Sequence, residues 1–496
     1  MIDPATFNLA QYVLSAGQVV PDKIALAVLG RTRAERWSYA RLTERVQAVA
    51  GQLRKTGLQP GDRLLLRIGN EPAFPLAFLG AIAAGIVPVP TSAALTVPEI
   101  TKIARELDPK AVVAAAGVAC PETDCPVLAT AALLESDAPG QPVWDLGAAN
   151  RPAYIVFTSG TGGTPRGVVH AHRAILARRM MWEGWYGLTA DDRLLHAGAF
   201  NWTYTLGTGL LDPWAIGATA LIPDPNIDTT ALPLLLKRHD ATIFAAAPGV
   251  YRQLLRSGPP ILPKLRHGLS AGEKLPAVTR SKWESVTGTP IHEAYGMSEC
   301  STFISGSPSR PAPDGTLGHA QPGRRIAIRA QGAEVETGSP GMICIHRDDP
   351  GLMLGYLGHA DETAARFDGE WFQTGDTGSM DATGAVTYLG RADDLINAGG
   401  LRVSPIEIED ALASHPSVAE AAACEVRVKA DTTIIAAFWV GETLDEQVLL
   451  DHVSSRLADY KRPRVLIQVD SLPRGANNKL LRRKLRQDWE ARNGHA

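Results

Sequence analysis

Short β-rich runs alternate with helical stretches along the chain from residue 23 to about residue 300. The pattern predicts strands at 63–68, 111–115, 219–222 and 242–246, and helices at 39–55, 97–107 and 230–239. Such alternation is typical of parallel sheets that are covered by helices on both faces. We therefore expect this part of the chain to form a large α/β domain with two helix-covered sheets.

Residues 310–390 have a different character. Short β segments such as 325–329 and 342–346 are separated by Gly/Pro turns with little helix, which favours a small antiparallel barrel or sheet. Beyond them, a helix at 405–413, strands near 419–427 and 433–440 and a helix at 445–457 indicate a compact α+β domain of about a hundred residues. The expected fold class is therefore a large α/β N-terminal domain that includes a small β barrel, followed by a small α+β C-terminal domain.

Composition excludes several classes of protein. The chain has 496 residues, 45% of them hydrophobic, which is ample for sizeable cores. A formal net charge of −3 gives no bulk electrostatic case for a nucleic-acid or membrane-surface partner, and we expect neither. The five cysteines include no C-x-x-C pair, so neither a disulfide framework nor a zinc site is indicated.

The N-terminal residues and the most apolar window argue against export and membrane insertion. Residues 1–11 contain no basic region and no apolar region, which predicts a cytoplasmic protein without a signal peptide. The window 74–90 is interrupted by prolines and glycines and falls short of the ~18 continuous apolar residues that a span needs. It predicts a buried helix at 75–84 that runs into a strand.

The segment TSGTGGTPRG (158–167) directly follows the apolar run 153–157, as a flexible loop would follow a strand at a solvent-facing edge. Its glycines let several backbone N–H groups turn toward one anion, its hydroxyls add donors, and Arg166 adds a planar cation. A Walker loop would need Gly-Lys followed by Ser or Thr, and a dinucleotide fingerprint would need a glycine where Pro165 stands. A polar hairpin turn is the alternative, but ten residues with one bulky side chain favour a nucleotide loop.

The stretch YIVFTSGTGGTPRGVVHAH (154–172) resembles the signature loop of the adenylate-forming superfamily of AMP-binding enzymes, which includes acyl- and aryl-CoA synthetases, luciferases and the adenylation domains of peptide synthetases. The family usually carries lysine at the position of Arg166. The resemblance implies that this loop binds ATP through Thr158, Ser159, Gly160, Thr161, Gly162, Gly163, Thr164 and Arg166.

Two further segments, SAGEKLP (270–276) and EAYGMSEC (293–300), resemble the family's next motifs. The resemblance implies that the first lines the adenine and acyl pockets with Ala271, Gly272 and Glu273. In the second, Tyr295 would stack on adenine beside Gly296, Ser298 would contact the α-phosphate and Glu299 would hold Mg²⁺. A purine offers a π-face to an aromatic ring and a hard cation prefers an oxygen ligand, which agrees with these roles. Taken alone, Glu299 would be a solvated loop carboxylate.

The segment WFQTGD (371–376) and the run that follows it resemble the ribose site and the hinge of the family. The resemblance implies that Asp376 and Arg391 bind the ribose, since a carboxylate can accept two hydrogen bonds from a diol. A lone Thr-Gly-Asp is otherwise an ordinary turn. Asp393 matches the pivot, so we expect an AMP- and acyl-binding domain at 1–390, a hinge at 391–394 and a mobile C-terminal domain at 395–496.

The expected C-terminal domain carries three more positions that match the family. The resemblance implies that Gly400 leaves room for the pantetheine thiol and that Arg402 approaches the nucleotide phosphate. Lys479, in LPRGANNKLLRRKLR (472–486), matches the catalytic lysine, although Asn477-Asn478 stand where the family more often has Thr-Gly. The neighbouring basic residues are interpreted as a solvated helix face.

Acyl choice is predicted to depend on AFNWTYTLGTG (199–209). Trp202 and Tyr204 are aromatic, and no basic residue is present to pair with a second carboxylate, which favours an aromatic, alicyclic or medium-chain monocarboxylate. The segment resembles benzoate-type CoA ligases. The two aromatics could equally be core residues.

The resemblance as a whole implies an ATP- and Mg²⁺-dependent carboxylate:CoA ligase that forms an acyl-adenylate and then an acyl-CoA thioester. Two alternatives stay open: a stand-alone adenylation enzyme that loads a carrier protein, and a non-catalytic nucleotide-binding homologue. The second would agree with two departures from the family pattern: Arg166 stands where lysine is usual, and Asn397 stands at a position that is often basic. A homodimer is compatible with the sequence.

Overall fold

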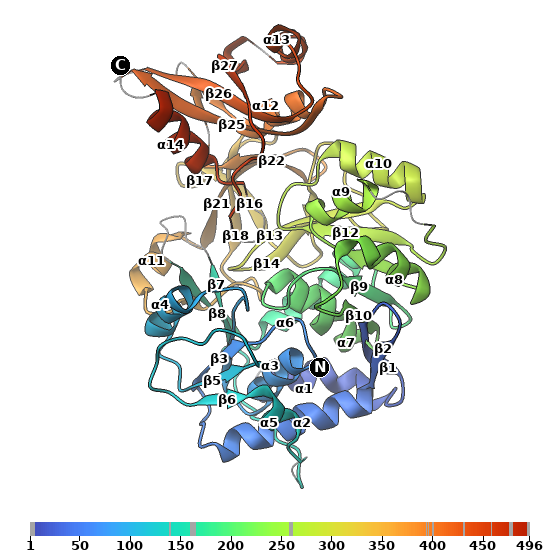
Figure 1. Cartoon of the computed structure of the whole chain (residues 1–496). Coiled ribbons are helices and arrows are strands. Elements are labelled where there is room, and N and C mark those ends of the chain that lie inside the picture. Colours follow the sequence, from blue (N-terminus) through green and yellow to red (C-terminus); the bar gives the residue numbers. More distant parts are fainter. Residues whose placement is uncertain are drawn as a thin grey trace. The chain divides into compact units, whose positions relative to one another are not determined.

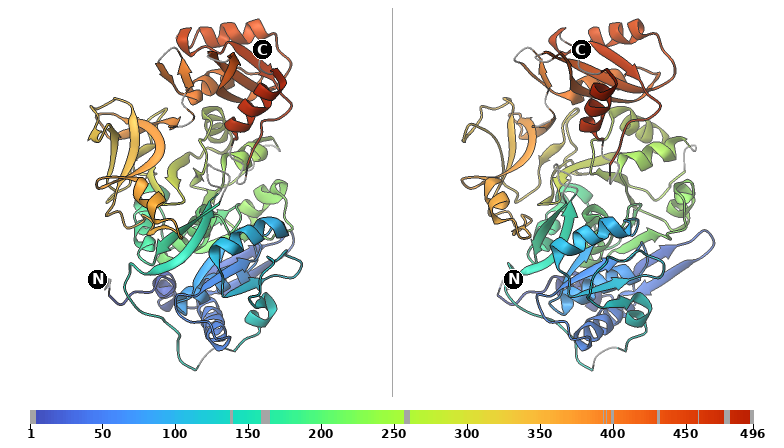
Figure 2. Two further views of the ribbon diagram at one scale, coloured as in Figure 1. Left: turned by 90° about the vertical axis from the view of Figure 1, so that its left-hand side faces the viewer. Right: turned by 60° about the vertical axis from the view of Figure 1, so that its left-hand side comes forward.

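The computed structural model describes residues 5–137, 140–158, 165–256, 261–392, 394, 396–398, 401–429, 432–457, 459–475 and 480–493. The chain divides into two compact units (Figures 1 and 2). The first comprises Met1–Ala312, Gly318–Arg325 and Arg347–Phe367, and the second comprises Pro313–Leu317, Ile326–His346 and Asp368–Ala496.

The largest sheet of the first unit is parallel at its centre. Its strands follow the order β15 (Gly318–Ala320), β14 (Ser301–Ser305), β13 (Ile291–Met297), β12 (His267–Ala271), β11 (Ile243–Ala245), β9 (Arg193–His196), β10 (Thr219–Pro223), β1 (Ile24–Leu29) and β2 (Ala34–Ser38). The strands from β13 to β1 are parallel, whereas β2, β14 and β15 pair antiparallel with their neighbours. The predicted parallel sheet is confirmed.

Two smaller sheets complete the first unit. The second sheet is parallel throughout and has the order β4 (Val87–Pro90), β3 (Arg63–Arg67), β5 (Ala111–Ala114) and β6 (Val127–Ala129). The third is antiparallel, with the order β19 (Gly355–Tyr356), β8 (Arg166–Ala171) and β7 (Pro152–Thr158).

The helices of the first unit agree with the expected ranges where strong local signals exist. Two of them, α2 (Tyr39–Lys55) and α4 (Val97–Leu107), begin and end at the predicted residues. In α4 the Glu99 carboxylate accepts hydrogen bonds from the backbone N–H and the hydroxyl of Thr96, a reciprocal cap that fixes the helix start. The predicted helix at 230–239 is a 3₁₀ turn, η4 (Thr229–Ala231), followed by α8 (Leu232–Arg238).

The remaining helices of this unit are mostly short. They are α1 (Leu9–Leu14), α3 (Ala73–Ala83), α5 (Thr130–Leu134), α6 (Ala174–Arg179), α7 (Asp212–Ile216), α9 (Pro248–Arg256), α10 (Ala277–Thr287), α11 (Ala360–Ala365), the 3₁₀ turn η1 (Ser15–Gln18) and the π-helical turns η2 (Trp182–Tyr186) and η3 (Thr205–Leu211).

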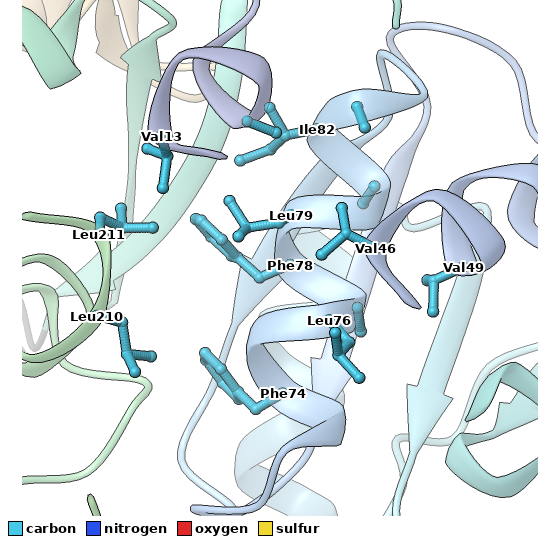
Figure 3. Packing of buried hydrophobic residues seen from close by; sticks show 14 of the residues in the cluster. Val13, Val46, Val49, Phe74, Leu76, Phe78, Leu79, Ile82, Leu210 and Leu211 are labelled. Atoms are coloured by element: carbon cyan, nitrogen blue, oxygen red, sulfur yellow. The ribbon is translucent and has the colours of Figure 1, made fainter. Parts of the chain in front are cut away.

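The core that supports η3 is built around α3, which is buried on all sides because it is apolar all round. Figure 3 shows Phe74 and Phe78 of α3 directed toward Leu210 and Leu211 of η3. On the opposite side α3 contacts α2 closely, since a Cβ at Gly80 would lie 2.6 Å from Val49. This packing explains why the apolar window 74–90 is core rather than a membrane segment.

The second unit begins with an antiparallel sheet. Its order is β17 (Ala333–Glu334), β16 (Ile326–Ala330), β18 (Gly341–His346), β21 (Trp371–Met380) and β22 (Ala385–Arg391), and β20 (Phe367–Asp368) pairs with β21. The short antiparallel strands expected at 310–390 are therefore present.

The C-terminal α+β elements are a hairpin of β23 (Ile396–Ala398) and β24 (Leu401–Val403), and a sheet of β25 (Val418–Lys429), β26 (Thr432–Gly441) and β27 (Val465–Gln468), with α12 (Pro405–Ala413), α13 (Glu446–Ser454), the 3₁₀ turn η5 (Asp459–Lys461) and α14 (Arg482–Asn493). Alternate residues of β26 face two separate cores: Ala437 and Trp439 pack with α12 and α13, and Ala436 and Phe438 pack with α14. The predicted helix at 405–413 is confirmed.

The predicted domain boundaries stay predictions. Asp393, the proposed pivot, lies outside the described residues. Among the described residues, no helix is both long and apolar enough to cross a membrane, and the cytoplasmic location stays a prediction too.

Candidate active site

The loop at 158–167 connects the two strands of a hairpin. Strands β7 and β8 are antiparallel, and Thr158 is the register partner of Arg166. The loop residues Ser159, Gly160, Thr161, Gly162, Gly163 and Thr164 lie outside the described residues. The sequence placed Arg166 and Gly167 in the loop, but both belong to β8, because the following β-branched residues extend a strand back to Arg166.

The Arg166 side chain already has an anionic partner. Its Nε and Nη2 donate to the two carboxylate oxygens of Glu362 on α11, at 2.8 and 2.7 Å, a bidentate arrangement. These two hydrogen bonds, which Arg166 donates and Glu362 accepts, raise the pKa of Arg166 and lower the pKa of Glu362. A phosphate that binds Arg166 would therefore compete with this carboxylate or share the guanidinium with it.

Glu299, the predicted magnesium ligand, is hydrogen-bonded to a residue of β19, which belongs to the same sheet as β7 and β8. The Tyr356 hydroxyl on β19 donates to Glu299 Oε1 at 2.8 Å, and the backbone N–H of Met353 donates to the Glu299 carbonyl at 2.7 Å. Burial raises the pKa of Tyr356, and the neighbouring Glu299 carboxylate raises it further. Because β19 pairs with β8, with Tyr356 opposite Val168, the hairpin and Glu299 are joined through one small sheet.

A second link runs from β8 to the motif at 293–300. His170 Nε2 lies 2.8 Å from the carbonyl oxygen of Ser298. Burial lowers the pKa of His170 to about 4, so the imidazole is neutral near pH 7. The structure therefore places Arg166, Ser298 and Glu299 on elements that are linked to one another, while their roles stay predictions. The sequence contains no pattern that identifies Tyr356 or His170 as their supports.

The donor set at Glu299 suits one hard cation. Its Oε1 accepts from Tyr356, whereas Oε2 has no hydrogen-bond partner among the described residues. Mg²⁺ commonly binds one or two carboxylates, retains several waters and is completed by substrate phosphates. In the described part of the chain there is no cluster of three or more His, Cys, Asp or Glu residues that could hold a metal by itself.

Tyr295 and Gly296 occupy the end of β13. Tyr295 is half-buried, and its ring lies edge-on to Phe303 at a centroid distance of 5.2 Å. A Cβ at Gly296 would lie 2.2 Å from the carbonyl oxygen of Ser301, so only glycine fits this bulge between β13 and β14. The adenine role of Tyr295 stays a prediction.

Trp202 lies against the segment at 270–276. A Cβ at Gly272, which has a φ of +97°, would lie 2.4 Å from the Trp202 ring, and Ala271 is the last residue of β12. Glu273 follows Gly272 in the same loop. The contact between Trp202 and Gly272 brings together two segments that the sequence assigned to acyl selection.

Tyr204 belongs to the core. Only 6% of it is exposed, its hydroxyl donates to the carbonyl of Leu269 at 3.0 Å, and its ring stacks on Trp185. Trp202 contacts Tyr204 edge-on at 5.2 Å and is only partly buried. The core alternative therefore describes Tyr204, whereas Trp202 lies at the edge of that cluster.

The structure contains a buried charge pair that the sequence did not reveal. The Arg178 guanidinium donates to the Asp212 carboxylate from Nε at 3.0 Å and from Nη2 at 2.6 Å, and both side chains are almost fully buried. Burial opposes the charge on Arg178, but Asp212 outweighs it and raises the pKa of Arg178. The two residues are 34 positions apart in no motif, so no local pattern could have indicated the pair.

Arg178 borders a small cavity with about 10 Å³ of free space, room for one water molecule. Its lining residues come from β7, β8, α6, the segment that leads into η3, η3 itself, the turn after β13 and the start of β14: Tyr154, His170, Arg178, Thr203, Leu206, Gly207, Leu211, Ser298 and Ser301. Ser298, the predicted phosphate contact, is therefore part of the wall of this cavity.

In the second unit, the predicted ribose residues are neighbours. Asp376 on β21 and Arg391 on β22 are register partners, and Arg391 Nη1 lies 3.4 Å from Asp376 Oδ1. The Tyr388 hydroxyl also lies 3.4 Å from Asp376 Oδ1. Arg402 is in β24, its side chain lies outside the described structure, and Gly400 and Lys479 are outside the described residues.

The chain is similar to known proteins over most of its length. The family model described as AMP-binding enzyme matches residues 15–357, and the model of the AMP-binding enzyme C-terminal domain matches residues 407–479. The chain is 32% identical to the benzoate–CoA ligase of Thauera aromatica, over 91% of this chain and 90% of that protein. It is 30% identical to the human mitochondrial acyl-coenzyme A synthetase ACSM2A, over 98% of this chain and 92% of that protein. The solved structure of ATP-bound MatB from Rhodopseudomonas palustris aligns with a TM-score of 0.87 at 28% identity and covers 98% of this chain and 100% of that chain.

Proposed function

Because the chain belongs to the AMP-binding enzyme family, we propose that it is an ATP-dependent carboxylate:CoA ligase. In the first half-reaction a carboxylate oxygen attacks the α-phosphorus of ATP, and the bond to pyrophosphate breaks. In the second, the sulfur of CoA attacks the acyl carbon, the bond from that carbon to the bridging oxygen breaks, AMP leaves with this oxygen, and the thiol proton is released. The products are an acyl-CoA thioester, AMP and pyrophosphate.

One observation carries the proposal. The hairpin that bears the nucleotide loop and the motif that bears Ser298 and Glu299 are joined through Tyr356 and His170. The Ser298 hydroxyl and Glu299, whose Oε2 has no hydrogen-bond partner among the described residues, are groups suited to a phosphate chain and its cation. If Glu299 were only a solvated carboxylate and the loop only a polar turn, neither would need the hydrogen bonds of Tyr356 and His170.

The chain's own residues then have defined tasks. Arg166 and the loop N–H groups would hold the outer phosphates, Tyr295 would stack on the adenine, and Asp376 with Arg391 would bind the ribose diol. Glu299 would hold Mg²⁺, which when bound supplies positive charge that offsets the phosphate oxygens. Lys479 would stabilise the charge on the carboxylate and the α-phosphate during adenylation, and Arg402 would approach the nucleotide phosphate. These assignments rest on the family motifs.

The acid is proposed to be an aromatic, alicyclic or medium-chain monocarboxylate. The partly buried Trp202 ring, set against Gly272, offers an apolar surface of the size of a ring or a short chain. The names of the relatives point the same way, since one is a benzoate–CoA ligase and another an acyl-coenzyme A synthetase.

Product analysis tests the proposal. The purified full-length protein is incubated with ATP, MgCl₂, CoA and a panel of monocarboxylates, and AMP, ADP and pyrophosphate are quantified. We expect AMP and pyrophosphate in equal amounts, dependent on acid, with a matching thioester. Stoichiometric ADP and phosphate would refute the assignment. Adenylation without thioester formation on free CoA would favour the carrier-protein alternative, and no turnover with any acid would favour the non-catalytic homologue.

A further inference from the structure

The cavity beside Ser298 has unused hydrogen-bonding capacity of both kinds. The first unused donor belongs to Ser301. Its hydroxyl oxygen accepts a hydrogen bond from Arg178 Nη1 at 2.6 Å, and its own O–H has no acceptor among the described residues. Because this oxygen accepts from Arg178 through one of its lone pairs, its O–H is directed away from the guanidinium.

Arg178 itself contributes a second donor. Nε and Nη2 are used by Asp212, with Tyr186 and Thr208 at 3.2 and 3.3 Å from Nη2. Nη1 carries two hydrogens, of which one goes to Ser301 and the other has no acceptor in the described part of the chain. Because Asp212 neutralises the charge, this end of the cavity is a neutral donor rather than a site for a second carboxylate.

The acceptor is His170. Its Nε2 faces a carbonyl oxygen, which can only accept, so Nε2 carries the hydrogen and Nδ1 presents a lone pair. His170 is 2% exposed, and its Nδ1 has no partner in the described structure. A buried acceptor left without a partner costs free energy unless a water or a ligand satisfies it.

The backbone around the cavity is shaped for this arrangement. Ser301 has a φ of +63°, a conformation that residues other than glycine rarely adopt. A Cβ at Gly207 would lie 2.0 Å from Arg178 Cζ, so the guanidinium can occupy its place only because residue 207 is glycine. Gly207 belongs to the π-helical turn η3, and such turns are frequent at functional sites.

From these groups we infer that the cavity takes a hydroxyl substituent of the acyl substrate, with Ser301 and Arg178 as donors and His170 as acceptor. A hydroxyl group is both an acceptor and a donor, and it is about the size of the single water for which the cavity has room. Ser301 is then the specificity-determining residue, and the substrate class narrows to hydroxylated monocarboxylates. This inference rests on the proposed ligase function.

Matched pairs of acids test the inference. The kcat/KM for acid-dependent AMP release is measured with benzoate and its three monohydroxy derivatives, with cyclohexanecarboxylate and its 4-hydroxy derivative, and with hexanoate and 6-hydroxyhexanoate. We expect a hydroxylated member to exceed its parent by at least about 10-fold, since a site built to bind a hydroxyl rejects an analogue that lacks it. In Ser301→Gly the ratio between the two should fall about 10-fold.

Glycine is the appropriate substitution because it removes the hydroxyl and suits the positive φ, so the fold is retained. Ser15→Gly, which removes an exposed serine hydroxyl at the end of α1, is the control and should leave the ratio unchanged. If a parent acid is turned over but no hydroxylated member exceeds its parent, or if Ser301→Gly lowers both members equally, the inference is overturned while the ligase function stands. If no acid yields AMP, the ligase function itself fails.

Discussion

Replacing Tyr356 by phenylalanine should impair adenylation through Glu299. The change removes one hydroxyl, which donates to Glu299 Oε1 at 2.8 Å, and leaves the ring that packs beside β8. A hydrogen bond to a charged group contributes about 1.5–3 kcal/mol. If that free energy serves to orient the carboxylate, its loss corresponds to a decrease of about 10- to 100-fold in kcat/KM for ATP.

The assay is pyrophosphate release at saturating acid, with MgCl₂ varied over a wide range. The Tyr356→Phe variant should need more magnesium for half-maximal rate, because its Glu299 is less well oriented. Glu299→Gln should lose magnesium-dependent adenylation strongly, since a neutral amide replaces the proposed charged ligand.

A double-mutant cycle decides whether Tyr356 acts through Glu299. On the Glu299→Gln background, Tyr356→Phe should cost less than about threefold, because the partner it orients is already lost. Equal losses on both backgrounds, or a wild-type magnesium response in Tyr356→Phe, would refute the reasoning. Circular dichroism of each variant checks that the fold is retained.

Three further outcomes are expected. Lys479→Ala should abolish acyl-adenylate formation but spare thioester formation from supplied acyl-AMP, whereas Gly400→Leu should do the reverse; equal loss of both half-reactions in both variants would contradict domain alternation. Trp202→Gly should shift preference toward bulkier acids by about 1–3 kcal/mol per methylene-sized change, and uniform loss of activity with unfolding would identify Trp202 as core. Burial lowers the pKa values of His170 and His196 from 6.5 to about 4 and about 3, so both imidazoles bind protons more readily in the unfolded chain. The melting temperature should therefore fall as pH decreases from 6.5 toward 4. A melting temperature that stays constant over that range in thermal denaturation would exclude this contribution.

The sequence by itself determined the elements whose signals are local. Helices α2, α4 and α12 begin and end at the predicted residues, because a cap and an apolar period of 3.6 residues are both encoded within the helix. The parallel sheet followed from the alternation of strands and helices. The motifs at 158–167 and 293–300 indicated the family because their residues are contiguous in the chain.

Tertiary structure decided the features that depend on residues far apart. Tyr356 supports Glu299 from 57 positions away, and Glu362 pairs with Arg166 across 196 positions. Arg178 and Asp212 would each be interpreted as a surface charge from sequence, yet they form a buried pair, because Gly207 leaves the space that the guanidinium occupies. Burial and pairing arise only when sheets and helices pack together, so a lone charged residue or glycine carries no local signal of either. Tyr204 is a further example, because the sequence alone does not distinguish an aromatic residue that faces a ligand from one that is buried in the core.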